Sequence, residues 1–132
     1  MLVSRFAVPY NASAALNDEA GKIFIENFIQ LHDLSSTSPN KDEKIDEAMD
    51  MIYDMIYDME VCYYTGFGRA DNQSTALRMA EQEALDNYKK ITGKTVTDPE
   101  FGHIVKTDHA FSTAGYNKTT VSVIAFLRVA AE

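Results

Sequence analysis

The chain has little cysteine, no long apolar run and few basic residues in its first half. Its 132 residues include one cysteine, Cys62, which excludes an internal disulfide framework and a thiolate-rich zinc site within one chain. No apolar run approaches the length of a membrane-spanning helix, and residues 1–10 lack a basic segment followed by an apolar stretch. We therefore expect no membrane association and no secretion signal. The cytoplasm is the predicted location, or the host cytoplasm if the protein is viral.

The formal net charge of −8 is unevenly distributed along the chain. Residues 1–66 hold 4 Lys or Arg against 12 Asp or Glu, whereas residues 67–132 hold 8 of each kind. The whole excess of negative charge therefore lies in the first half. Because nucleic-acid binding draws on basic side chains that neutralise phosphates, we expect no direct nucleic-acid binding. A basic protein partner remains compatible with this charge.

The composition is that of an ordinary folded domain. Hydrophobic residues make up 45% of the chain and charged residues 24%, and the length suits a single domain with a real core. We predict one domain over residues 1–132. Turn-forming residues cluster at 35–40, which predicts a mobile loop there.

The clearest local pattern lies near the middle of the chain. β-branched and aromatic residues at 61–65 predict a strand. Gly66 and Gly68 then predict a turn or bulge, or a close approach of the backbone to another element. A helix follows, with its N-cap expected within 71–74 and its end at Gly93. Apolar residues spaced by three and four predict its buried face, which consists of Leu77, Ala80, Ala84, Tyr88 and Ile91.

The rest of the chain predicts three further strands and two further helices. Alternating residues at 2–10 predict a first strand, and apolar stripes within 20–34 and 45–59 predict two helices. Residues 101–114 and 119–130 predict two strands joined by a short connection. The predicted order is β-α-α-β-α-β-β. This order suits an α+β fold in which helices pack on one face of an antiparallel sheet of about four strands.

The last predicted strand has two apolar faces. Val121, Val123 and Leu127 share the better one, which we expect to pack on the helix face that contains Leu77. Ile124 and Phe126 point the other way. Because exposed apolar patches usually mark interfaces, these two residues predict a homodimer.

The second predicted helix is unusually acidic. Residues 41–60 hold 2 Lys against 8 Asp or Glu, and aspartates recur at every fourth position from 46 to 58. Like charges at this spacing destabilise a helix by roughly 0.2–0.5 kcal/mol per pair, a cost that burial of the Met/Ile stripe can offset. The ladder is either a solvated face or a docking surface for a basic or nucleic-acid-binding protein, which it would engage as a nucleic-acid mimic. The predicted partner-binding residues are Asp46, Glu47, Asp50, Asp54 and Asp58.

Two alternatives use other residues. A small-molecule-binding homo-oligomer could form its site near the glycine turn at 66–69, with the ligand-binding residues Tyr63, Tyr64, Phe67 and Arg69. A small hydrolase could be built on His103, Asp108 and His109. In an extended strand, however, the two histidines share a face roughly 20 Å apart while Asp108 points to the other.

No catalytic signature accompanies these residues, and we predict no catalytic residue, no metal site and no cofactor. The preferred hypothesis is a non-enzymatic acidic interaction protein. Its size and blockwise acidity would suit an inhibitor, encoded by a virus or a mobile element, that blocks a host nucleic-acid enzyme.

Overall fold

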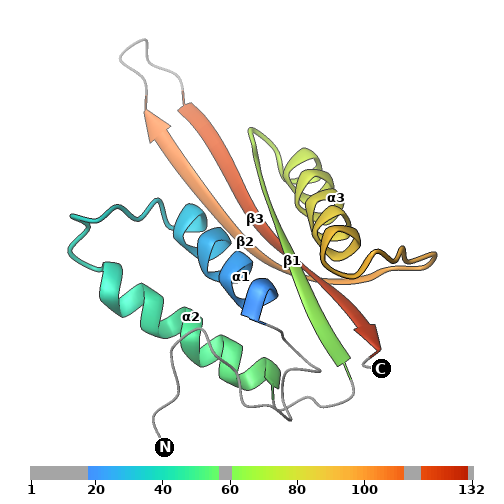
Figure 1. The fold of residues 1–132 in the computed structure, drawn as a ribbon. Coiled ribbons are helices and arrows are strands. Elements are labelled where there is room, and N and C mark those ends of the chain that lie inside the picture. Colours follow the sequence, from blue (N-terminus) through green and yellow to red (C-terminus); the bar gives the residue numbers. More distant parts are fainter. Residues whose placement is uncertain (1–17, 57–60, 112–116, 131–132) are drawn as a thin grey trace, which may run out of the picture.

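The computed structural model describes residues 18–56, 61–111 and 117–130 (Figure 1). In chain order the elements are α1 (Asp18–Leu31), α2 (Lys41–Ile56), β1 (Val61–Ala70), α3 (Gln73–Thr92), β2 (Glu100–Phe111) and β3 (Asn117–Ala130). The three strands form one antiparallel sheet in the order β1-β3-β2. None of the helices in these ranges is long and apolar enough to cross a membrane.

The fold class predicted from the sequence is confirmed as α+β with an antiparallel sheet. The described sheet has three strands rather than about four, and the first predicted strand, at 2–10, lies outside the described residues. The two predicted helices correspond to α1 and α2. The predicted loop at 35–40 lies between them, where the Ser35 N–H donates to Ser38 Oγ at 2.8 Å.

The glycines at 66 and 68 do not form a turn. β1 continues through both of them to Ala70 and pairs residue by residue with β3 without a bulge. A Cβ atom at Gly66 would collide with the backbone of Ala80 and Ala84, and one at Gly68 with the carbonyl oxygen of Ala76. The predicted turn and bulge are therefore wrong, and the other predicted alternative, a close approach of the backbone to another element, is confirmed. The glycines lie in a straight strand because α3 packs directly on its backbone.

The ends of α3 match the local sequence signals. The Asn72 side chain accepts a hydrogen bond from the Thr75 N–H at 2.8 Å, which makes Asn72 the N-cap. Gly93 ends the helix in the left-handed region, with φ of 75°, and its N–H donates to the Lys89 carbonyl oxygen.

Helices cover both faces of the sheet, so the prediction that they pack on one face is wrong. Neighbouring residues of a strand point to opposite faces. Gly66 faces α3, whereas the side chain of Thr65 accepts a hydrogen bond from Asn27 Nδ2 of α1 at 3.1 Å. We call these two sides of the sheet the α3 face and the α1 face. Figure 1 shows α1 and α3 on either side of β1, and α2 packs against α1.

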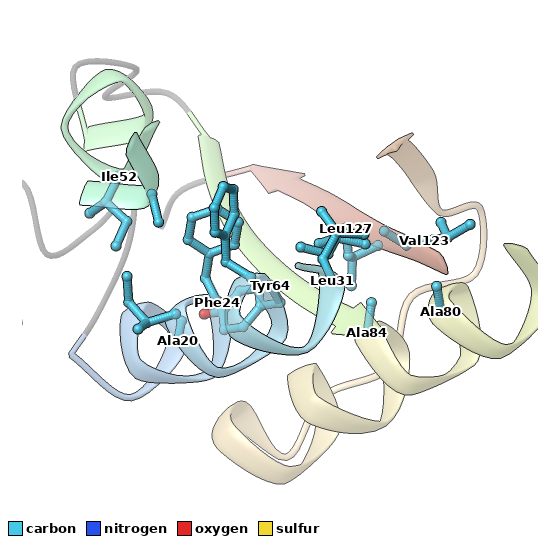
Figure 2. Close-up of a cluster of buried hydrophobic side chains, with 14 of the residues drawn as sticks. Ala20, Phe24, Leu31, Ile52, Tyr64, Ala80, Ala84, Val123 and Leu127 are labelled. Atoms are coloured by element: carbon cyan, nitrogen blue, oxygen red, sulfur yellow. The ribbon is translucent and has the colours of Figure 1, made fainter. Parts of the chain in front are cut away.

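The α3 face contains the predicted core. Ala80 and Ala84 of α3 are buried, as are Val121, Val123 and Leu127 of β3 (Figure 2). This part of the prediction is confirmed, although Leu77 and Tyr88 lie at its margin and are only partly buried.

The α1 face is also closed by packing. Ile124 is fully buried, and the ring of Phe126 lies 5.4 Å from that of Phe24 in α1, centroid to centroid. The apolar patch that predicted a homodimer is therefore inside the monomer. The homodimer stays a prediction, and Ile124 and Phe126 no longer support it.

Candidate functional site

The acidic residues of α2 lie on the solvent-facing side of the molecule. Asp46, Glu47, Asp50 and Asp54 are all exposed, and we call these four residues the acidic flank. The fifth predicted partner-binding residue, Asp58, lies outside the described residues. Lys44 forms an ion pair with Glu47 at 3.2 Å. The opposite side of α2 is buried and contains Ala48, Met49 and Ile52.

An exposed tyrosine that was not among the predicted site residues, Tyr53, lies next to the acidic flank. Tyr53 follows Asp50 by three positions, so the helical spacing makes these two side chains neighbours on the surface of α2. Its exposed fraction is 41%, which makes it one of the large hydrophobic residues exposed in the described part of the chain. The spacing of Tyr53 from Asp50 and Asp46, three and seven positions, was available in the sequence and indicates that these residues share one side of the helix.

An open pocket of about 540 Å³ adjoins the end of this flank. Tyr63, Phe126 and Arg128 come from the α1 face, where Tyr63 and Arg128 are paired across β1 and β3. The walls are mainly apolar, and charged groups are present on α2, β2 and β3. Its lining residues are Met51, Asp54, Tyr63, Glu100, Phe101, Gly102, His103, Phe126 and Arg128.

The four ligand-binding residues predicted near the glycines do not form one site. Tyr63, Phe67 and Arg69 belong to the α1 face, whereas Tyr64 belongs to the α3 face. Tyr63 lines the pocket described above, and Tyr64 lines a separate cavity of about 360 Å³. The four residues therefore do not converge on one site, because the segment expected to be a turn is a continuous strand.

Arg69 is held in a structural role. Its Nε donates to Ser122 Oγ at 2.8 Å and its Nη2 to the Gln30 carbonyl oxygen at 2.7 Å. It also forms an ion pair with Asp33 at 3.0 Å, and its guanidinium lies 5.2 Å from the centroid of the Phe67 ring. These contacts fasten the end of α1 to the sheet.

The smaller cavity on the α3 face contains the single cysteine. Burial raises the pKa of the Cys62 thiol, and burial is also the main cause that raises the pKa of Tyr64 to about 12. Both side chains are therefore neutral at physiological pH. Since the thiolate is the reactive form of cysteine, Cys62 is a poor nucleophile.

The residues of the hydrolase alternative are kept apart by the strand. His103 and His109 point to the α3 face and Asp108 to the α1 face, as the alternation predicts. His103 Nε2 contacts Glu81 Oε2 at 2.6 Å, His109 Nδ1 contacts Thr119 Oγ1 at 3.2 Å, and Asp108 pairs with Lys106. Within the described ranges no group of three or more His, Cys, Asp or Glu residues could hold a metal ion.

Comparison with protein-family models, with curated proteins and with solved structures finds no match to this chain.

Proposed function

We propose that this is a non-enzymatic interaction protein that docks on a basic or nucleic-acid-binding protein through the acidic flank of α2. The observation that supports this proposal is an exposed tyrosine among exposed carboxylates, on a helix whose other side is buried. Tyrosine and arginine are enriched among the residues that dominate interface energies. The role would be inhibitory if the flank occupies the surface that the partner uses for nucleic acid.

Arginine is the partner side chain that best fits this surface. A guanidinium can form paired hydrogen bonds to a carboxylate and can also stack on an aromatic ring. The exposed carboxylate of Asp50, one helical turn from Tyr53, offers the first contact, and the tyrosine ring offers the second. An arginine-rich surface would also relieve the repulsion between carboxylates one helical turn apart.

The test compares two variants that lose the same charge. Asp46→Asn with Asp50→Asn removes two carboxylates from the flank and leaves the lining of the pocket unchanged. Asp86→Asn with Asp98→Asn removes two exposed carboxylates elsewhere and serves as the control. A partner is captured from lysate with the parent protein, purified, and titrated against all three proteins at low and high salt.

We expect the flank variant to lose at least tenfold in affinity while the control keeps the affinity of the parent. Binding of the parent should weaken as salt shortens the Debye length from about 10 Å to about 3 Å. Tyr53→Ala should also weaken binding. Equal affinity of the parent and the flank variant for the same partner at low salt would contradict the proposal.

The pocket beside α2 favours a second candidate function, the binding of a small molecule. Its volume of about 540 Å³ lies within the usual range for ligand sites. Apolar walls formed by Met51 and Phe126, with Asp54, Glu100 and Arg128 also in the lining, fit a ligand with an apolar body and a charged or polar group.

A thermal-shift screen tests this candidate. Met51→Trp should fill the pocket and abolish the stabilisation by a hit, whereas Met79→Trp, at a position that is 47% exposed on α3, should leave it unchanged. Hits that stabilise both variants equally would show that the ligand binds elsewhere.

A further inference from the structure

The outer edge of β2 has no partner among the described strands. β2 spans twelve residues and pairs only with β3, because it is the last strand in the order β1-β3-β2. Helices α1 and α3 pack mainly over β1 and β3, and α3 reaches β2 through the contact between Glu81 and His103. Val105, near the centre of β2, is 41% exposed. A long edge strand of this kind is a template for pairing with another chain.

The usual protections of an edge strand are weak in β2. Its pairing with β3 is unbroken from Glu100 to Phe111, so no bulge bends it, and it contains no proline. Lys106 is the one lysine of the strand, and Asp108 on the same face forms an ion pair with it at 2.9 Å. The lysine charge is therefore balanced on the strand itself.

The order of these charges is self-complementary. Two copies of one strand can pair antiparallel about a two-fold axis that is perpendicular to the sheet and runs between the strands. One residue then lies opposite its own copy, and we say that the axis passes through that residue. Residues equally far before and after that position then lie opposite each other. If the axis passes through Thr107, Lys106 lies opposite Asp108 of the partner subunit, and the same pair forms a second time. Opposite charges and paired threonines stabilise neighbouring strands.

The neighbouring registers lack this match. An axis through Lys106 would place two lysines opposite each other, and an axis through Asp108 would place two aspartates opposite each other, both of which are destabilising. With the axis at Thr107, the exposed Val105 lies opposite His109 of the partner subunit on the other face.

We propose that two copies of the protein associate through their β2 strands, antiparallel about Thr107, to form one continuous six-stranded sheet from the three strands of each copy. The occupant of this edge, which no other described strand covers, is a second copy of this chain. The surface differs from the acidic flank, so this inference is independent of the proposed function.

Charge exchange tests this register. Lys106→Asp alone and Asp108→Lys alone each place like charges opposite each other, so each variant should sediment as the 14.8 kDa monomer where the parent sediments as a dimer. Mixing the two variants restores opposite charges across the pair and should restore the dimer. The double variant, Lys106→Asp with Asp108→Lys in one chain, should also form a dimer. Circular dichroism of each variant confirms that it is folded.

A cross-link provides an independent measurement. In a Cys62→Ser background, Thr107→Cys places two thiols opposite each other on the axis and should give a disulfide-linked dimer under mild oxidation. Thr97→Cys, at an exposed position between α3 and β2, is the control and should not.

The proposal is overturned by a parent protein that stays monomeric up to near-millimolar concentration. It is equally overturned by a dimer that persists in both single charge variants, since another surface or another register must then form it. A mixture of folded single variants that remains monomeric has the same consequence.

Discussion

Thr65 is the residue at which both helical layers are tied to the sheet. Its hydroxyl accepts a hydrogen bond from Asn27 of α1, and its carbonyl oxygen accepts one from Asn87 Nδ2 of α3 at 2.9 Å. Asn27 and Thr65 are both buried. Replacing either residue by an apolar one would therefore remove the hydrogen bond between them and leave a buried polar side chain without this partner. The sequence predicted a strand at this threonine but gave no sign of its partners, which lie 38 and 22 positions away.

His32, at the end of α1, should make the stability of the protein depend on pH. Burial is the main cause that lowers its pKa from the ordinary value of 6.5, followed by the charges of Lys44 and Lys106, while Glu47 and Asp108 act in the opposite direction. The unfolded chain therefore binds this proton more readily than the folded protein. The contribution of neutral His32 to stability is complete above about pH 6.5 and is lost as the pH falls from there through the lower folded pKa.

Urea unfolding between about pH 8 and pH 5 measures this effect. We expect the free energy of unfolding of the parent to fall on acidification by more than that of His32→Gln. Parallel curves for the parent and His32→Gln would show that His32 does not contribute.

At the scale of elements, the contact between β1 and α3 decides how closely the two layers approach. Ala76, Ala80 and Ala84 recur at every fourth position of α3 and are fully buried, and they lie over Gly66 and Gly68. Small residues on both elements bring the helix backbone against the strand backbone. The sequence showed both halves of this contact but not that they meet, so two glycines after a predicted strand resembled a turn.

Replacement of one glycine should separate the layers. Gly66→Ala places a methyl group against the backbone of α3, which cannot move aside as a side chain can, and we expect a loss of about 1–3 kcal/mol or more in the free energy of unfolding. Gly102→Ala on β2 is the matched control. Its nearest neighbour would be Phe126 Cβ at 3.9 Å, so the change should be neutral or stabilising by about 0.4–1 kcal/mol. Chemical denaturation of both variants tests this, and equal losses would contradict the close contact.

At the scale of the whole molecule, the sequence predicted the positions and ends of single helices better than it predicted how the helices and strands pack together. The positions of α1, α2 and α3, the Asn72 cap and the Gly93 stop all follow from residues within one or two helical turns. Which helices cover which face of the sheet does not follow from such local signals. Ile124 and Phe126 indicated a second apolar face on β3, but only the path of α1 shows that this face is covered within the same chain.

The two candidate sites also differ in whether the sequence could predict them. The acidic flank was predicted because helical periodicity alone aligns Asp46, Asp50 and Asp54. The pocket could not be predicted, since Met51, Tyr63 and Phe126 come from three elements that meet only in the folded protein.

If two copies pair through β2, the perpendicular axis keeps the α1 faces on the same side. The dimer would then present two acidic flanks toward one partner surface, and the second contact would form at a raised effective concentration.

The position of β3 has a consequence for the protein during its synthesis. β3 is the central strand of the described sheet, and β1 and β2 are each hydrogen-bonded to it rather than to one another. It is also the last of the described elements to leave the ribosome. Until β3 has been translated, β1 and β2 lack the one described strand to which each is hydrogen-bonded, and the apolar faces of α1 and α3 lack this central strand to cover. The sheet therefore assembles only when translation has passed β3, and chaperones have that whole interval in which to bind the nascent chain.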